Sequence, residues 1–341
     1  MFMASIQWSD KSNADGYRYG FNIVSWAGPN ATSPDVWKEA IDKIYRSGMR
    51  SFTLVTHRFV DKKTGRIADN SQFGLTGSPT NGELVAAILE GKRLGMQVSI
   101  NPFVEIDNPN GIGHEWRGSL DFSGPALRQF FKHYGGYLSE MASLASGTGT
   151  DRLYVGSELK ALSSNPDARA HWSDLIGALR DIVGRKILLT YAANHDEYVQ
   201  VPFWRELDEI GVDAYFSLAS RTEAEGRGKP SVDLIKRAWF QHLRSLHAFS
   251  KEQERPILLS EWGIVPFDHA THEPWNGQPS DVMDSDEQIS AYQATIEATL
   301  VQDQWLKGIQ FWHWNLQSVS GSHFGIRDES RVFRLITEYL N

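Results

Sequence analysis

Short apolar runs alternate with longer segments of helical periodicity along the chain. The apolar runs are nearly continuous, as is typical of strands buried on both faces of a parallel sheet. Eight runs are predicted as strands, at residues 17–26, 51–57, 97–105, 151–158, 186–194, 209–217, 256–264 and 307–315. A strand followed by a helix is therefore the repeating unit of this sequence.

The segments between the strands are amphipathic. Within residues 285–304, Ile289, Tyr292, Ile296 and Leu300 share one face of a helix. Further helices are predicted at residues 33–49, 80–96, 123–145, 168–184, 231–251 and 330–340. An apolar face of this kind predicts that each helix packs against a sheet.

Start and stop signals flank several of these helices. Ser33 followed by Pro34 is typical of an N-cap and a first helical position. Gly48, Gly95 and Gly184 stand where the first, second and fourth of the long helices are expected to end, and glycine suits a left-handed C-terminal stop.

Eight βα units predict an α/β fold, a single (β/α)8 TIM barrel with elaborated βα loops. The fifth connection is short for a crossover helix, so residues 199–207 are expected to form a stub. The competing fold is a doubly wound open sheet, but the first strand is followed by WAGPN rather than a glycine-rich GxGxxG turn. Residues 1–341 are expected to form one domain, with residues 1–16 as an N-terminal extension.

Composition narrows the class of partner. The 34 Lys and Arg residues are outnumbered by 42 Asp and Glu residues, which argues against a nucleic-acid partner. No apolar stretch approaches the length of a membrane span, and the absence of cysteine excludes disulfides, thiolate metal sites and cysteine nucleophiles. The 12 tryptophans are numerous, and flat rings with a polar edge suit sugar faces as well as large cores.

The first residues, MFMASIQWSDKSNADG, lack the basic and apolar segments of a signal peptide. The chain as given is therefore expected to be cytoplasmic. Secretion is the alternative if a leader has been trimmed from this sequence. Oligomeric state is not predicted.

Glu158 and Glu261 stand at or near the carboxyl ends of two predicted strands, where a barrel of this type carries its reactive groups. Glu158 follows LYVGS and Glu261 follows PILLS. Regular alternation places Glu158 on the face of Tyr154, and Glu261 on the face of Leu259, with both carboxyls in the barrel mouth. The fourth and seventh strands face each other, which allows a separation of about 5 to 5.5 Å, the spacing of a retaining glycosidase.

The sequence resembles the clan A glycoside hydrolases over essentially its whole length. YVGSEL at 154–159 and LLSEWG at 258–263 carry the resemblance, and the first is similar to the G-[ST]-E-L motif of glycoside hydrolase family 113, the mannanase-like branch. The resemblance implies that Glu158 is the acid/base and Glu261 the nucleophile. The chain departs from the clan at Ser157, where most members have an asparagine that contacts the sugar 2-hydroxyl.

Two further strand ends gain roles from this resemblance. GVDAYFS matches the clan strand whose tyrosine hydrogen-bonds the nucleophile, which implies that role for Tyr215. Asp213 is expected to make an ion pair or a structural hydrogen bond. In FWHWN, alternation places Trp312 and Trp314 on one face, and the resemblance implies that Trp312 lies beneath the sugar, with Trp314 nearer the rim.

Polar and aromatic residues at other strand ends and in the loops are predicted to contact substrate. They are Trp26, His57, Asn101, Trp116, Ser157, Asn194, His195 and Trp262. A structural hydrogen bond is the commoner role for the two histidines. The long connections 105–122 and 263–284 are expected to form cleft walls, because loops of this length usually bind ligands.

Other chemistries find little support in the sequence. His269, His272 and Glu273 lack the helical HExxH spacing, so a solvated loop is predicted there and no metal. No GxSxG elbow or Walker loop is present, and no cofactor is expected. Lys160, just past Glu158, leaves a Schiff-base aldolase as one alternative.

The sequence thus predicts a retaining β-glycoside hydrolase that acts by double displacement. The expected partner is a carbohydrate, a β-linked polysaccharide or oligosaccharide that is β-mannan-like or related. The alternatives on the same site are a transglycosylase and a barrel that binds glycan without cleaving it.

Overall fold

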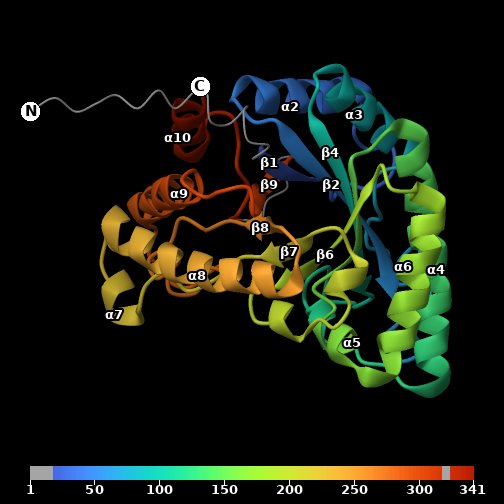
Figure 1. Ribbon diagram of the computed structural model, residues 1–341. Coiled ribbons are helices and arrows are strands. Elements are labelled where there is room, and N and C mark those ends of the chain that lie inside the picture. Colours follow the sequence, from blue (N-terminus) through green and yellow to red (C-terminus); the bar gives the residue numbers. More distant parts are fainter. Residues whose placement is uncertain (1–17, 317–322) are drawn as a thin grey trace, which may run out of the picture.

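A closed parallel β-barrel forms the centre of the molecule (Figure 1). The computed structural model describes residues 18–316 and 323–341, so the predicted extension at 1–16 lies outside the described residues. The barrel strands are β1 (Arg18–Val24), β2 (Ser51–Val60), β4 (Gln97–Ile106), β5 (Arg152–Ser157), β6 (Leu188–Asn194), β7 (Ile210–Asp213), β8 (Ile257–Trp262) and β9 (Leu306–Asn315). Because β1 pairs with both β2 and β9, the sheet closes, which confirms the (β/α)8 barrel and rules out the open sheet.

Helices surround the barrel and follow the predicted order. They are α2 (Pro34–Arg46), α3 (Asn81–Arg93), α4 (Gly124–Thr148), α5 (Lys160–Ser164), α6 (Arg169–Val183), α7 (Arg221–Ala224), α8 (Val232–Gln253), α9 (Ser285–Thr299) and α10 (Arg331–Leu340). The fifth connection is the expected stub, since it holds only the 3-10 turns Tyr198–Gln200 and Trp204–Glu206. A two-residue strand, β3 (Ile67–Ala68), pairs antiparallel with the end of β2. No helix of the described ranges is long and apolar enough to cross a membrane.

The predicted helix signals are present. The Ser33 hydroxyl accepts a hydrogen bond from the Val36 N–H at the start of α2. Gly48, Gly95 and Gly184 follow their helices with φ angles of 90°, 72° and 63°, a region that favours glycine. Local sequence therefore determines where these helices begin and end.

Two kinds of packing support the barrel. A large apolar core lies between the strands and the helices, whereas Tyr154, Ala192 and Leu258 form a separate small cluster across β5, β6 and β8. A buried ion pair, Arg152 Nε to Glu209 Oε2 at 2.6 Å, joins β5 to the start of β7.

Bulges interrupt the strands that carry the two glutamates. Between the pairs Tyr154 with Thr190 and Ser157 with Ala192, β5 has one residue more than β6. Likewise β8 has one residue more than β7 between Leu259 and Glu261. One extra residue reverses the face of every side chain beyond it.

The expected face sharing is therefore wrong at Glu261, whereas Glu158 still reaches the interior side of the barrel on which Tyr154 lies. Leu259 belongs to the outer core, whereas Leu258 packs with Tyr154 in the small cluster. Glu158 lies beyond the end of β5 in the left-handed region, with a φ of 52°. Both carboxyls still reach the barrel mouth, but the bulges and the left-handed turn bring them there rather than regular alternation.

Candidate active site

A cavity of about 760 Å³ opens at the carboxyl ends of the strands. Its lining is Phe103, Gly113, Trp116, Arg117, Glu158, Asn194, His195, Asp196, Tyr215, Glu261, Trp275, Trp312 and Phe324. Seven residues predicted from the sequence are among them: Glu158, Glu261, Tyr215, Trp116, Asn194, His195 and Trp312. The structure therefore brings both glutamates into one cavity.

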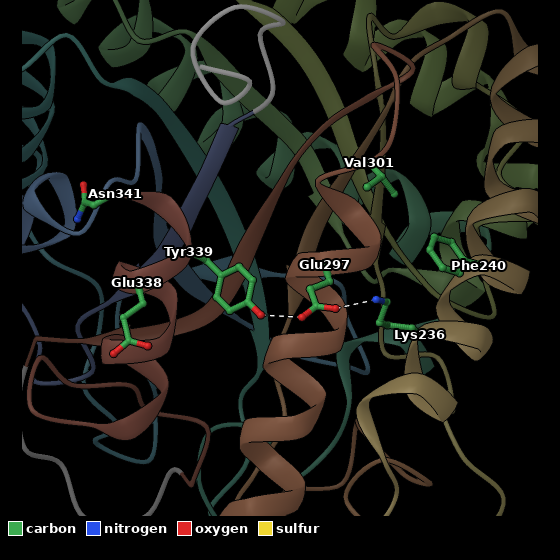
Figure 2. Close-up of a pocket in the computed structure, with 7 residues that line it drawn as sticks. All are labelled: Lys236, Phe240, Glu297, Val301, Glu338, Tyr339 and Asn341. Atoms are coloured by element: carbon green, nitrogen blue, oxygen red, sulfur yellow. Dashed lines mark hydrogen bonds and ion pairs between the residues drawn. The ribbon is translucent and has the colours of Figure 1, made fainter. Parts of the chain in front are cut away.

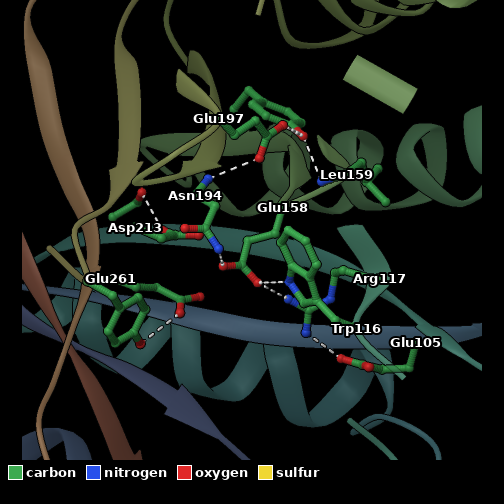
Figure 3. A network of polar contacts seen from close by, with 12 residues as sticks. Glu105, Trp116, Arg117, Glu158, Leu159, Asn194, Glu197, Asp213 and Glu261 are labelled. Atoms are coloured by element: carbon green, nitrogen blue, oxygen red, sulfur yellow. Dashed lines mark hydrogen bonds and ion pairs between the residues drawn. The ribbon is translucent and has the colours of Figure 1, made fainter. Parts of the chain in front are cut away.

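Three donors hold the carboxylate of Glu158 (Figure 3). Asn194 Nδ2 donates to its Oε1 at 2.9 Å. Trp116 Nε1 and Arg117 Nη1 both donate to its Oε2, each at 3.0 Å. The backbone N–H of Glu158 donates to the carbonyl of Ala192 at 2.7 Å, so the left-handed turn is itself fixed to β6.

Glu261 has a more apolar setting. The Tyr215 hydroxyl donates to its Oε2 at 3.2 Å, and its Oε1 has no hydrogen-bond partner in the described part of the chain. Burial raises the pKa of Glu261 well above its usual range, and the Glu158 carboxyl adds to this, whereas Arg117 and the Tyr215 hydroxyl act in the opposite direction. Tyr215 itself lies two residues past the end of β7 rather than in the predicted strand.

Arg117 supplies the positive charge of the cavity. Its guanidinium pairs with Glu105 at 2.5 Å and with Glu158 at 3.0 Å, and it lies 4.0 Å from the centre of the Phe103 ring. This arrangement orients the cation between two carboxylates. The length of the connection 105–122 indicated a cleft wall, but the Glu105 pairing was not predicted.

Asp213 is the cross-strand neighbour of Glu261. It accepts a hydrogen bond from the Ser260 hydroxyl at 2.7 Å, one of the two roles expected for it. Burial raises the pKa of Asp213 well above its usual range, and the carboxyls of Glu261 and Glu158 raise it further.

A second buried glutamate supports the surroundings of Glu158. Glu197 accepts from the Asn194 N–H at 3.0 Å and from the Tyr191 hydroxyl at 2.6 Å. Tyr191 in turn accepts from the Leu159 N–H at 2.7 Å (Figure 3). Burial raises the pKa of Glu197 to about 7. This network positions the residues around Glu158, and it was not predicted from the sequence.

Aromatic rings form the floor and walls. Trp312 stacks on Phe103, with ring centres 6.1 Å apart, and Trp26 packs against the same cluster. Trp116 and Trp275 are partly exposed on the walls, and Trp275 stacks on His195. Phe103 and Phe324 were not predicted, because apolar residues at these positions are indistinguishable from core residues in sequence.

Two tryptophans predicted to contact substrate lie elsewhere. Trp262 is fully buried and packs against Tyr292 of α9, because the residue after the inward-turned Glu261 faces outward. Trp314 packs against Phe21 and Phe333 instead of sharing a face with Trp312. The reason is an extra residue in β9 between its pairings with β1, which reverses the alternation.

Four other predicted contacts do not line the cavity. His57 is buried, packs at a tilt against the Trp26 ring and hydrogen-bonds the Thr76 carbonyl through Nε2 at 3.1 Å. Asn101 and Ser157 are buried, and Trp26 is partly buried against the small cluster of Val24, Val55 and Phe103. The end of a strand thus places a residue near the barrel mouth without deciding whether its side chain enters the cavity.

Lys160 and the loop histidines also fall outside the cavity lining. Lys160 pairs with Asp196 at 2.6 Å. His272 Nδ1 hydrogen-bonds the Ala219 carbonyl, and Glu273 accepts from Asn276. These partners leave the aldolase and the histidine metal site without structural support.

A different group of carboxylates has spacing suited to a cation. In the described ranges, Asp268, Asp284 and Glu287 each offer an oxygen within 4.8 Å of the others. Backbone N–H groups of Gly226, Gly228 and Thr271 already donate to these carboxylates. The group therefore fastens loops to the start of α9.

A second large cavity, of about 780 Å³, lies between α8, α9 and α10 (Figure 2). Its Glu297 accepts from Tyr339 at 2.6 Å and pairs with Lys236 at 2.7 Å. It contains none of the predicted site residues.

The barrel and its two facing carboxyls define the class of protein as a (β/α)8 glycoside hydrolase. The family model of Glycoside Hydrolase Family 113 matches residues 25–329. The chain belongs to this family, as its YVGSEL and LLSEWG motifs indicated.

Solved structures give the same fold. A GH113 β-1,4-mannanase complex is 20% identical, with a TM-score of 0.76, over 95% of this chain and 98% of that one. The GH113 β-mannanase of Alicyclobacillus acidocaldarius is 21% identical, with a TM-score of 0.74 and the same coverage. A family 5 mannosidase of Rhizomucor miehei is 9% identical, with a TM-score of 0.61, over 96% and 94% of the chains. No curated protein matches the sequence.

Proposed function

We propose that this protein is a retaining glycoside hydrolase of β-mannan-like polysaccharides or oligosaccharides. The observation that carries the proposal is that Glu158, from the end of β5, and Glu261, from β8, enter one cavity. The Tyr215 hydroxyl hydrogen-bonds Glu261 there. Family membership and the β-mannanases among the solved relatives support the substrate class. The carboxyl separation of about 5 to 5.5 Å that this mechanism needs stays a prediction.

Glu261 is proposed as the nucleophile. Its Oε1 is free of hydrogen bonds to the described residues, so this oxygen can attack the anomeric carbon. The Tyr215 hydroxyl holds the other oxygen and orients the carboxylate. Arg117 favours the ionised form that attack requires.

Glu158 is proposed as the acid/base. It would protonate the departing glycosidic oxygen while the glycosyl–enzyme bond forms at Glu261, and then remove a proton from the water that breaks this bond. Asn194, Trp116 and Arg117 keep its two oxygens in place. Trp312 is proposed to support the sugar at the point of cleavage.

Glutamine variants test the assignment. E158Q and E261Q are each expected to lower kcat on a mannan oligosaccharide by at least about a thousandfold, because each removes a group that acts in the transition state. Binding of the sugar, measured by calorimetry, is expected to persist. E115Q is a matched control, since Glu115 pairs with Lys62 and lies outside the cavity lining. Unchanged turnover in E158Q or E261Q would contradict the proposed mechanism.

The first anomer formed tests retention. Proton NMR is expected to show the β-anomer before mutarotation, and an α-anomer would contradict double displacement. Azide should rescue E158A as a β-glycosyl azide and E261A as an α-glycosyl azide, which separates the two roles. Binding without turnover by the wild type would favour the non-catalytic alternative, and products longer than the substrate would favour transglycosylation.

A further inference from the structure

The two glutamates divide the barrel mouth into unequal arcs. Around the closed sheet, β6 and β7 lie between β5 and β8 on one side, and β4, β2, β1 and β9 lie between them on the other. Trp312 of β9 and Phe103 of β4 stack together on the larger arc. The smaller arc, with β6 and β7, is therefore the side of the two glutamates away from Trp312.

An aromatic pair occupies the smaller arc. Trp275 stacks on His195, with ring centres 5.3 Å apart and an angle of 17° between the planes. His195 directly follows β6 and meets the Phe216 ring edge-on. Burial lowers the pKa of His195, so its ring is a neutral stacking partner.

Trp275 is exposed and yet firmly supported. Half of its surface is open, at 50% exposure, although both it and His195 line the cavity. An indole ring held open to solvent in a cavity is suited to the apolar face of a ligand ring. One face of the Trp275 ring is supported by His195, and the exposed part of the side chain is available to a ligand in the cavity.

The loop that carries Trp275 is fastened to the loop after β7. Leu218 N–H donates to the Thr271 carbonyl at 2.8 Å, and the Ser217 hydroxyl donates to the His272 carbonyl at 2.5 Å. Glu287 of α9 accepts from both the N–H and the hydroxyl of Thr271. The ring is therefore placed before ligand arrives, which lowers the entropy cost of binding.

We propose that Trp275, supported by His195, binds the sugar ring that leaves during cleavage and the acceptor ring in any transfer reaction. This inference rests on the proposed function. The side of the cavity agrees with the chemistry, because Asn194, the residue before His195, holds the oxygen Oε1 of the acid/base Glu158. A departing ring on this platform lies beside the group that protonates it.

Two substrates separate this role from catalysis. A β-1,4-mannan oligosaccharide has a departing sugar, whereas a β-oligomannosyl fluoride loses only fluoride. Trp275→Ala is expected to lower kcat/KM for the oligosaccharide by at least about tenfold. It is expected to change kcat/KM for the fluoride by less than about twofold. Trp275→Phe, which keeps a ring, should recover most of the loss.

Trp305→Ala is the matched control. Trp305 stacks on His247 at 4.7 Å and 14°, a similar pair that lies outside the cavity lining. Trp305→Ala should leave kcat/KM unchanged for both substrates. Equal losses on both substrates in Trp275→Ala, or no loss on either, would overturn the platform. A wild type that cleaves neither substrate would instead contradict the proposed function.

Discussion

The two carboxylates of the cavity differ in what surrounds them. Glu158 accepts three hydrogen bonds from side chains, whereas Glu261 accepts one, from Tyr215. Burial raises the pKa of Glu261, and the cation of Arg117 is the main opposing influence. Each residue near Glu261 therefore has a separable effect on its ionisation or its orientation.

Removing the hydroxyl of Tyr215 should slow the chemical step. A hydrogen bond to a charged group contributes about 1.5 to 3 kcal/mol, so Tyr215→Phe is expected to lower kcat about 10- to 100-fold with little change in KM. Steady-state kinetics on an oligosaccharide measure this. Tyr198→Phe, a substitution outside the cavity lining, is the control. A raised KM at constant kcat would show that Tyr215 serves binding instead.

The pH dependence of the enzyme follows from Glu261. As the proposed nucleophile, Glu261 must be ionised to attack, and a raised pKa means that activity is lost at a higher pH on acidification. The acidic limb of kcat/KM is therefore expected well above pH 4.5, the ordinary pKa of a glutamate.

Arg117→Gln should move this limb to still higher pH, because Arg117 lowers the pKa of Glu261. Arg58→Gln is the control, since Arg58 pairs with Glu140 and Asp69 outside the cavity lining. A limb that stays in place or moves to lower pH in Arg117→Gln would contradict the electrostatic role.

At the scale of elements, α9 and two loops act as a unit. Asp284 caps α9 by accepting from the N–H groups of Asp286 and Glu287. Glu287 then holds Thr271 at the base of the loop that carries Trp275. Burial raises the pKa of Glu287 to about 7, and the hydrogen bonds from Thr271 oppose this.

This shift gives the fold a pH-dependent stability. The folded protein holds the Glu287 proton more tightly than the unfolded chain does. The contribution of Glu287 to the free energy of unfolding is therefore greatest below pH 4.5 and is lost as the pH rises through about 7. Glu287→Gln should remove a decline on the order of 2 kcal/mol between pH 5 and 8. Denaturant unfolding at both pH values measures it, with E115Q as the control. An unchanged decline in Glu287→Gln would refute the assignment.

At the scale of the whole molecule, the ion pair Arg152 with Glu209 crosses the barrel below the cavity. Both side chains are almost fully buried, and Arg152 also donates to Ser99 on β4. The pair links three strands that are distant in sequence. Removing one partner leaves an uncompensated buried charge.

Glu209→Gln is therefore expected to lower the free energy of unfolding by about 3 to 5 kcal/mol. The double variant Arg152→Met, Glu209→Leu should recover most of that loss. Neither change touches the cavity, so kcat at a temperature where the variants are folded should stay near the wild-type value. If Glu209→Gln were as stable as the wild type, the loss of Glu209 would not leave Arg152 as a costly buried charge, and this prediction would be wrong.

Much of the fold was accessible from the sequence because its signals are local. The strand runs, the apolar faces of the helices and the Ser33 and Gly48 signals all depend on neighbouring residues. The site was accessible in part: Glu158, Glu261 and Tyr215 stand in recognisable motifs and line the cavity. Trp314 was misplaced because the bulge in β9 leaves no mark in the residue pattern. Trp262 faces outward because it directly follows the inward-facing Glu261.

By itself, the sequence determined the order of the elements and the closed barrel, and it singled out Glu158 and Glu261 as candidates. Only the tertiary structure decided which side chains enter the cavity, how Arg117 joins Glu105 to Glu158, and that Trp275 meets His195. The physical reason is the separation along the chain over which each kind of interaction acts. Periodicity and capping act between residues a few positions apart, whereas bulges, ion pairs and ring stacking depend on segments that meet only when the barrel closes.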